Sequence, residues 1–446
     1  MSELRAGTCA LPLEPPLGVP MMGYGARVGV AEGVLDPLHA RALYLAAGSD
    51  LLLVECDLCL LAPQQAAALR ARLAARTGVP PARILVGCIH THAGPDTGFG
   101  ALLGGGEPAP HVAALFDAVV EAGARAVAAA APARLGLGRA EARIGRNRRA
   151  QDGPLDPEVL VARVDRADGA PLAVLYVHGC HPTALGHENL AYSADWVAAA
   201  GAAIAARVPG ANPIFALGAH ADVDPRTRGL LDLATPGQST GVDYATCCAL
   251  GRELGAAVGE AAAAIETSAR APVAAASDRV AIPTWRPDEA SRRAALAALD
   301  LPVEREIGTA ELFALERERT AAYPPAERRE RLARLRRYLR DRTAARFAFA
   351  AEPAVEVQVL RLGDALLLAL PLEPTVDVGL DWKRRAPAPR AAVVGIANGW
   401  MRYLPHARNF EEPDAYVKYE ILQSTLVPEA AERLLARGEA LARSLA

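Results

Sequence analysis

The residues best suited to chemistry lie in the segment Cys88–Asp96, which reads Cys-Ile-His-Thr-His-Ala-Gly-Pro-Asp. The apolar run Ile84–Val86 before it predicts a short buried strand, and Gly94-Pro95 marks the loop after it. Residues two apart in a strand point to the same side, so we expect His90 and His92 to leave the strand end together. Two imidazoles in such a place suit a metal site or an acid–base pair. The alternative is two ordinary polar residues in a turn.

The same pattern, an apolar strand followed at once by polar residues, recurs three times along the chain. The polar residues are His178 and His181 after 175–177, His220, Asp222 and Asp224 after 214–217, and Glu373 after 366–370. In open α/β sheets ligands bind beyond the strand ends, so we expect these tips to converge on one crevice. Counting the first segment, five of the nine histidines lie at three strand tips, which favours a shared function over chance. They are His90 and His92, His178 and His181, and His220.

A metal ligand set can be chosen from these residues. A zinc site that keeps a position open for water or substrate typically takes three protein ligands, often two histidines and one carboxylate. His90, His181 and Glu373 supply such a set. A divalent ion there would polarise a carbonyl and activate water, which hydrolysis of an amide or ester requires. For His178 and His220 we favour structural hydrogen bonds over a direct chemical role.

Taken together and in their order, the motifs resemble the catalytic domain of the neutral (non-lysosomal) ceramidases, zinc amidases that cleave the N-acyl bond of ceramides. The resemblance runs from about Arg5 to Glu420 and rests on several short segments. These are Gly33–Arg41, His90–Pro95, Asn147–Arg148, His181–Thr183, Ala221–Pro225, Leu370–Pro374 and Ala397–Tyr403. Each motif is short, so the signal comes from their combination.

The resemblance implies four metal ligands and two further site residues. The implied ligands of Zn²⁺ are His90, His181, Glu373 and Tyr403. His92 matches a histidine that hydrogen-bonds the substrate or the reacting oxygen. Arg148 matches an arginine that stabilises negative charge on the scissile carbonyl.

The chain departs from the family at the motif Gly-Asp-Val-Ser-Pro, whose serine has been proposed as a nucleophile. Asp224 stands in place of that serine, so a serine acyl-enzyme at this position is excluded. We expect the Asp224 carboxylate to orient a metal-bound water or to bind a cationic group of the substrate. Asp222, Asp224 and His92 are the candidates for the general base. Asp96-Thr97 replaces a Gly-Gly of the family, which should alter the pocket wall.

These residues must be positioned by secondary structure, and the sequence predicts an α/β fold with a mixed β-sheet core flanked by helices. The predicted strands include two within 41–61 and those at 159–164, 172–177, 214–217, 355–360 and 365–370. Helices are expected at 63–76, at 110–130 and from Asp195 onward. Residues 286–346 carry dense Arg and Glu at helical spacing, which predicts an inserted helical hairpin. No linker interrupts the chain, so we expect one catalytic domain over 1–446.

The composition indicates a soluble globular protein, since 52% of its residues are hydrophobic. A net charge of −3 provides no electrostatic footprint for nucleic acid or an anionic membrane. The N-terminus lacks a signal peptide, and Glu55 and Asp57 interrupt the longest apolar run. Seven scattered cysteines suit a reducing cytoplasm, and we interpret Cys56 and Cys59 as buried thiols. We therefore expect a cytoplasmic protein.

The sequence thus predicts a zinc-dependent hydrolase that cleaves a C–N amide bond of a small soluble substrate by attack of a metal-activated water. The secretion signal and the C-terminal β-sandwich of the ceramidases have no counterpart here, so we do not expect ceramide as the substrate. Two alternatives stay open: an esterase or lactonase with the same site, and a non-catalytic protein that binds zinc or a small molecule. The sequence predicts neither the substrate nor the oligomeric state.

Overall fold

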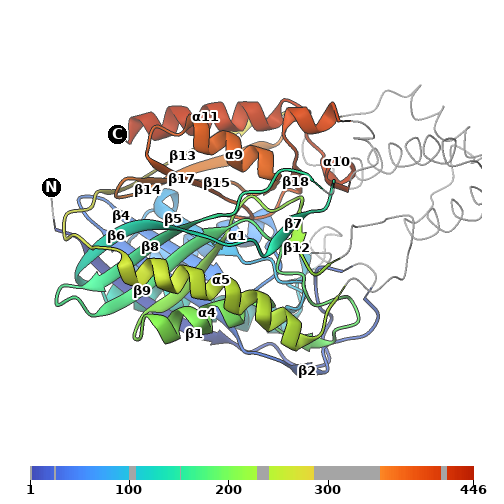
Figure 1. Cartoon of the computed structure of the whole chain (residues 1–446), viewed down its shortest axis with the longest axis horizontal. Coiled ribbons are helices and arrows are strands. Elements are labelled where there is room, and N and C mark those ends of the chain that lie inside the picture. Colours follow the sequence, from blue (N-terminus) through green and yellow to red (C-terminus); the bar gives the residue numbers. More distant parts are fainter. Residues whose placement is uncertain are drawn as a thin grey trace, which may run out of the picture.

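The fold is α/β, as the sequence predicts, with two mixed β-sheets and helices on their outer faces (Figure 1). The computed structural model describes residues 3–24, 27–99, 107–150, 152–228, 241–285, 352–412 and 419–445. The helical hairpin expected at 286–346 lies outside the described residues.

The larger sheet has eight strands in the order β11-β9-β8-β6-β1-β3-β4-β5. The pairs β4–β5 and β9–β11 are parallel, and the other neighbours are antiparallel. Its strands are β1 (Arg5–Leu13), β3 (Leu38–Ala46), β4 (Asp50–Cys56), β5 (Ile84–Cys88), β6 (Ala131–Glu141), β8 (Glu158–Arg166), β9 (Pro171–His178) and β11 (Asn212–Leu217).

The smaller sheet has the order β13-β14-β15-β17, and three two-stranded pairs lie outside both sheets. Its strands are β13 (Val273–Ala281), β14 (Ala354–Leu362), β15 (Ala365–Ala369) and β17 (Arg390–Val394). The short pairs are β2 (Gly33–Val34) with β10 (Ala191–Tyr192), β7 (Gly145–Asn147) with β12 (Val223–Pro225), and β16 (Glu373–Pro374) with β18 (Tyr403–Leu404).

The helices form the outer layers of the molecule. In Figure 1, α9 and α11 lie over the smaller sheet, whereas α4 and α5 lie on the opposite side, against the larger sheet. The helices are α1 (Pro63–Thr77), α3 (Pro110–Ala128), α4 (Trp196–Arg207), α5 (Tyr244–Ala264), α9 (Val376–Arg385), α10 (Tyr419–Gln423) and α11 (Ala430–Ser444), with 3₁₀ turns η1 (Pro81–Arg83) and η2 (Ala407–Phe410). In the described part of the chain, none of them is long and apolar enough to cross a membrane.

The strands are buried on both faces, which separates the core into layers. In β4, Leu53 packs with the side chains between the two sheets, and Val54 packs on the opposite face toward the helices. In β14, Leu360 joins the inter-sheet core, and Val359 packs with the side chains under α9 and α11. Burial of such a side chain contributes about 1.5–3 kcal/mol. Successive side chains of a strand therefore pack into different layers of the core, and this packing holds the strands in place.

Local signals set the helix boundaries that the sequence predicts. Helix α1 begins at Pro63, where the Gln65 side chain accepts a hydrogen bond from the backbone of Ala62, and it ends at Gly78 in a left-handed conformation (φ 77°). Asp195 caps α4 by accepting a hydrogen bond from the backbone N–H of Trp196.

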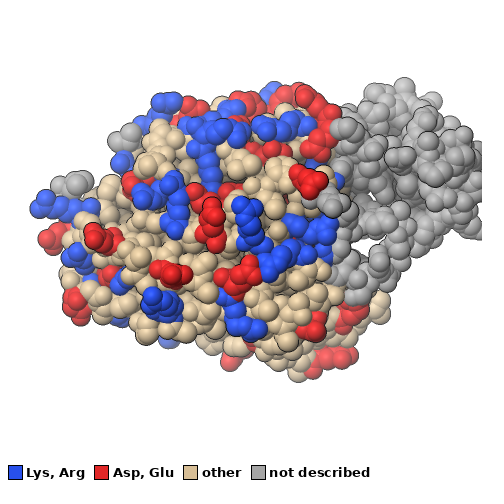
Figure 2. Space-filling model, viewed as in Figure 1, with Lys and Arg blue, Asp and Glu red and all other residues tan. Residues whose placement is uncertain are grey.

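The surface carries charges of both signs. Figure 2 shows basic and acidic side chains interspersed over one face of the molecule. Ion pairs account for part of this mixing, for example between Lys383 and Asp156 and between Arg385 and Glu432. The seven cysteines are free thiols, and Cys56 and Cys59 are buried, as predicted.

Candidate metal centre

The strand ends that the sequence singles out meet at one place. Strands β9 and β11 are parallel neighbours, so the segments after them, which carry His181 and His220, leave the same edge of the larger sheet. Strand β5, parallel to β4, ends just before His90. Glu373 begins the short strand β16 after β15 of the smaller sheet. Four segments from both sheets thus converge, as expected for a ligand site at strand ends.

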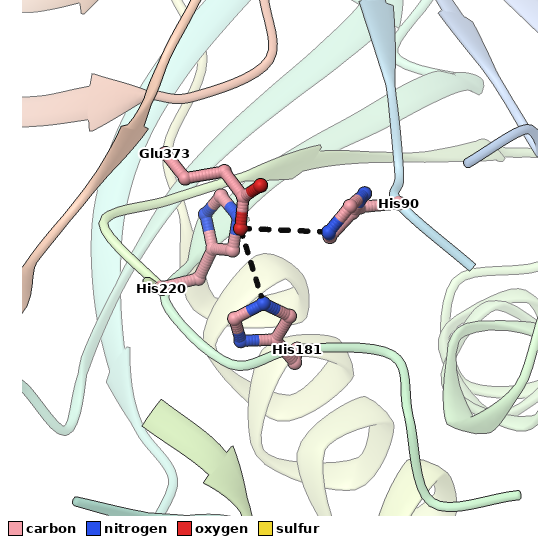
Figure 3. A group of neighbouring side chains, drawn as sticks. All are labelled: His90, His181, His220 and Glu373. Atoms are coloured by element: carbon pink, nitrogen blue, oxygen red, sulfur yellow. Dashed lines mark ion pairs between the residues drawn. The ribbon is translucent and has the colours of Figure 1, made fainter. Parts of the chain in front are cut away.

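The convergence forms a buried group of three imidazoles around one carboxylate (Figure 3). The Oε2 atom of Glu373 lies 3.3 Å from Nε2 of His181 and 3.6 Å from Nε2 of both His90 and His220. The ligand atoms of all four residues lie within 4.8 Å of one another, and no side chain of the group is more than 4% exposed.

Hydrogen bonds fix the orientation of each member of the group. The Nδ1–H groups of the three imidazoles donate to backbone carbonyls: His90 to Cys59 (2.8 Å), His181 to Val223 (3.2 Å) and His220 to Gly218 (2.8 Å). The Glu373 Oε1 atom accepts a hydrogen bond from Trp400 Nε1–H (2.7 Å). These hydrogen bonds leave Nε2 of each imidazole and Oε2 of Glu373 as the atoms that face one another.

The donor atoms fit a divalent metal ion. Within the described residues, Nε2 of His181, Nε2 of His220 and Oε2 of Glu373 have no hydrogen-bond partner, although buried polar atoms almost always have one. Burial lowers the pKa of His220, and it lowers the pKa of His181 to about 3, so both rings are neutral. Burial alone would lower the pKa of His90 as well, but Cys59 and Glu373 outweigh it and raise that pKa well above its usual value, so a metal ion must displace a proton from His90. Burial alone would raise the pKa of Glu373, but the neighbouring imidazoles outweigh it and hold the pKa well below its usual value. Neutral imidazoles and an ionised carboxylate are the states that bind zinc.

The backbone at His90 differs from the predicted arrangement. Strand β5 ends at Cys88, so strand alternation does not place His90 and His92 on one side. Instead, His90 adopts a left-handed conformation (φ 68°), and the chain turns so that the two ring centroids lie 4.7 Å apart. Strained backbone of this kind persists where surrounding contacts hold it, frequently at functional sites. The backbone N–H of His90 donates to the carbonyl of Leu58 and contributes to that restraint.

A second strained segment borders the group from the other side. Ile396, Asn398 and Arg402 have positive φ angles of 50°, 62° and 75°. The Asn398 side chain accepts a hydrogen bond from the backbone of Val86 (3.0 Å), which ties the segment to β5. The carbonyl of Arg402 accepts a hydrogen bond from the backbone of Glu373 (2.9 Å). This segment therefore links the strand before His90 to the carboxylate of the group.

Tyr403 lies next to Glu373. The two residues are direct partners in the parallel pair β16–β18, and Tyr403 is buried. Its ring packs edge-to-face on Tyr419, and the Arg148 guanidinium carbon lies 5.9 Å from the ring centroid of Tyr403. Burial and the nearby carboxylate raise the pKa of the phenol well above its usual value, so the hydroxyl is protonated when no metal is bound.

His92 lies against the group without joining it. Its Nε2 atom is 3.3 Å from Nε2 of His90, and its ring packs edge-to-face on Tyr24, with centroids 4.7 Å apart. Burial and the neighbouring cationic groups lower its pKa well below the usual value, so the ring is neutral. Gly23 packs against the same ring, with φ 113°, and a Cβ atom at Gly23 would lie 2.4 Å from Cγ of His92. A larger residue at position 23 would therefore occupy space that the His92 ring fills.

Arg148 and Asp224 form part of a buried charge network beside the group. Arg148 donates from Nη1 to Asp224 (3.2 Å) and from Nε to Glu420 (2.7 Å). The Asp224 carboxylate also lies 3.6 Å from Nδ1 of His181. Burial alone would raise the pKa of Asp224, but Arg148 and Arg228 outweigh it and hold the pKa at about 2. Because Asp224 is already neutralised by arginine, its surroundings favour positioning of Arg148 and His181 over capture of a cationic substrate.

Two of the sequence candidates have other neighbours. The Asp222 carboxylate accepts hydrogen bonds from the backbone of Val376 (2.8 Å), at the start of α9, and from the Asn147 side chain (3.3 Å). Burial raises its pKa to about 7. His178 is the last residue of β9, opposite Leu217, and lies outside the four-residue group. Because Asp222 accepts a hydrogen bond from the first residue of α9, its carboxylate helps to hold that helix in place.

His220 belongs to the buried group, although the sequence favours a structural hydrogen bond for it. Its Nδ1–H donates a hydrogen bond to the carbonyl of Gly218, and its Nε2 atom faces the carboxylate of Glu373. The available signal was its place after a strand that pairs in parallel with β9. That pairing is a tertiary contact and cannot be read from local sequence.

Comparison with protein-family models and with curated proteins gives no match. Comparison with solved structures finds a ceramidase complexed with C2, at 19% sequence identity and a TM-score of 0.73. It also finds the neutral ceramidase from Pseudomonas aeruginosa, at 20% identity and a TM-score of 0.70. Each match covers 100% of this chain and 75% of the solved chain. The chain therefore has the fold of these ceramidases, as its motifs predict.

Proposed function

We propose that this protein is a zinc-dependent hydrolase that cleaves a C–N amide bond of a small soluble molecule and is not a true ceramidase. One observation carries the proposal: in the described part of the chain, buried imidazole and carboxylate donors converge with atoms that have no hydrogen-bond partner, in a fold shared with solved ceramidases. Seven free thiols support a cytoplasmic location.

The residues proposed to hold the ion are His90, His181 and Glu373, with Tyr403 as the further ligand that the family resemblance implies. Nitrogen and carboxylate donors of this kind favour zinc among the common divalent ions. When bound there, a divalent ion polarises a carbonyl oxygen and lowers the pKa of a water to near neutrality. The protein must then move protons and stabilise charge around that point.

His92 is proposed as the proton carrier. Its ring is neutral and lies beside His90, so it is able to accept a proton from the attacking water and to donate it to the departing amine. Edge-to-face contact with Tyr24 keeps the ring at the site. Asp222 is a weaker candidate, because its carboxylate is bonded to the backbone of α9.

Arg148 is proposed to stabilise negative charge on the carbonyl oxygen. Its guanidinium lies close to the rings of Tyr403 and Tyr419, and the carboxylates of Asp224 and Glu420 keep it charged despite its burial. Within the described residues its Nη2 atom has no hydrogen-bond partner, so this donor is available to a substrate oxygen. Asp224 and Glu420 would keep the guanidinium oriented while the charge develops.

The test is turnover by purified full-length protein with its bound metal quantified. A panel of linear amides, including N-acyl amines and N-acyl amino acids, is compared with matched esters and lactones. Amine release that stops on chelation, returns with Zn²⁺ and is lost in His90→Ala with the fold intact supports an amidase. Preference for the esters or lactones would change the bond assigned to the site. Inactivity toward the whole panel by zinc-loaded protein would leave a binding function.

A further inference from the structure

We infer that His220 is a metal ligand, so that three imidazoles and one carboxylate hold the ion and its affinity depends on His220 more than on Tyr403. This inference rests on the proposed function only in assuming that a divalent ion is bound. It changes the ligand set that the family resemblance implies. His220 lies in none of the motifs that carry that resemblance and directly precedes the motif Ala221–Pro225.

The geometry does not distinguish His220 from the two histidines that the resemblance assigns as ligands. The Nε2 atoms of His220 and His90 lie at the same distance, 3.6 Å, from Oε2 of Glu373. The rings of His220 and His181 have centroids 4.7 Å apart, and those of His220 and His90 lie 5.5 Å apart. Three rings that surround one carboxylate oxygen at similar distances form one set of donors.

The two nitrogens of His220 have different surroundings. Its Nδ1–H donates to the carbonyl of Gly218 (2.8 Å), which leaves the lone pair on Nε2. The residue is completely buried, and in the described structure Nε2 has no hydrogen-bond partner. A histidine with a purely structural role would satisfy both nitrogens, because an unpaired buried acceptor is destabilising. Coordination of a metal satisfies Nε2, and the hydrogen bond of Nδ1 is the usual partner of such a ligand.

The surrounding backbone prevents the ring from turning away. A Cβ atom at Gly395 would lie 3.0 Å from Cε1 of His220, so the backbone at Gly395 packs closely against the ring. The backbone of Ala221 donates to the carbonyl of Pro374, next to Glu373, and the backbone of Gly395 donates to the carbonyl of Leu217. The segment that carries His220 is thus bonded to the segment that carries Glu373, and the two donors are held together.

The charge of this set suits a Lewis acid. Three neutral imidazoles and one carboxylate leave a net charge of about +1 on a bound divalent ion, whereas a phenolate ligand in place of one imidazole would cancel it. Tyr403 then remains a neutral phenol beside Arg148, available to donate a hydrogen bond to the substrate.

The test measures metal binding rather than turnover. Zn²⁺ affinity is measured by competition with a chromophoric chelator, and Co²⁺ is added to the metal-free full-length protein to record its visible absorption. His220→Asn is the main variant, because its side-chain amide retains a donor near Nδ1 and lacks Nε2; His220→Ala is the second. Tyr403→Phe tests the alternative ligand, and His178→Ala is the control, since His178 is also a buried histidine at a strand end.

We expect His220→Asn to weaken Zn²⁺ binding at least about 100-fold, because loss of a residue that merely supports a ligand already costs about 10–100-fold. The Co²⁺ spectrum should change in the same variant, and both measurements should stay near wild type in Tyr403→Phe and His178→Ala. Unchanged affinity and spectrum in a folded His220→Asn or His220→Ala protein would overturn the inference. An inactive protein that nevertheless binds zinc through His220 would contradict the proposed hydrolase and leave this inference intact.

Discussion

The Nε2 atoms of His90 and His92 lie 3.3 Å apart, and the planes of the two rings cross at 89°. Only His90 belongs to the group around Glu373 with His181 and His220. The two residues of the His-Thr-His motif therefore have different surroundings, and substitution should separate their roles.

We predict that His90→Ala loses the bound metal, whereas His92→Ala retains it and loses rate. Removal of a proton carrier should lower kcat by about 10²–10⁴-fold. Elemental mass spectrometry measures the metal content of each variant. The kcat on the best amide substrate measures the loss of rate. Equal loss of metal in both variants would instead indicate that both histidines are ligands.

We predict that Gly23→Ala lowers kcat by about 100-fold with the metal retained, because the new Cβ would displace the His92 ring and misplaced catalytic groups cost about that much. Gly18→Ala is the matched control. Gly18 also has a positive φ (80°), but a Cβ there meets no atom within 4 Å. Both variants place a Cβ at a residue with positive φ, so an equal loss of kcat in Gly18→Ala would show that contact with His92 is not the cause.

We predict that Asp224→Ala lowers the free energy of unfolding of the metal-free protein by about 3 kcal/mol, because it leaves a buried arginine with one partner fewer. Urea unfolding of Asp224→Ala, Arg148→Met and the double variant provides a double-mutant cycle. The coupling between the two residues should be favourable, since their ion pair is buried and 3.2 Å long. Additive effects of the two substitutions would argue against a stabilising pair.

We predict that Glu55→Gln stabilises the protein increasingly as the pH rises above about 4.5. Glu55 lines a cavity of about 250 Å³ together with Arg41 and Asp57, and within the described residues neither of its carboxyl oxygens has a hydrogen-bond partner. A Cβ at Gly87 would lie 2.2 Å from Oε2, so the carboxyl group packs directly against the backbone of the neighbouring strand. Burial raises the pKa of Glu55 well above its usual value, so the folded state retains its proton.

The sign follows from proton binding. Above the ordinary pKa the unfolded chain has released this proton and the folded protein has not, so rising pH favours unfolding until the folded pKa is reached. The difference between Glu55→Gln and wild type should grow by at most about 1.4 kcal/mol per pH unit. Urea unfolding in buffers between pH 4.5 and neutrality measures this difference in the free energy of unfolding. Glu141→Gln is the control, because Glu141 is exposed. A constant difference across this range would show that Glu55 is ionised in the folded protein.

Local sequence signals determined much of the secondary structure and three members of the buried group around Glu373, counting Glu373 itself. Pro63, Gly78 and Asp195 mark helix boundaries through backbone geometry and capping, which depend on a few neighbouring residues. Apolar runs that end at polar residues identified His90, His181 and Glu373, which the structure brings into one buried group. Parallel strand ends do not explain this meeting, because β5 runs antiparallel to β9 and β11 and Glu373 follows a strand of the other sheet.

Tertiary structure alone decided which of the remaining polar residues join the site. His178 is the last residue of β9 and His220 follows β11, and of the two only His220 faces Glu373. The left-handed backbone of His90, and not strand alternation, brings His92 beside it. Asp222 bonds to α9 and Asp224 to Arg148, over sequence separations of 154 and 76 residues. Such contacts depend on the packing of distant segments, which no local pattern of residues encodes.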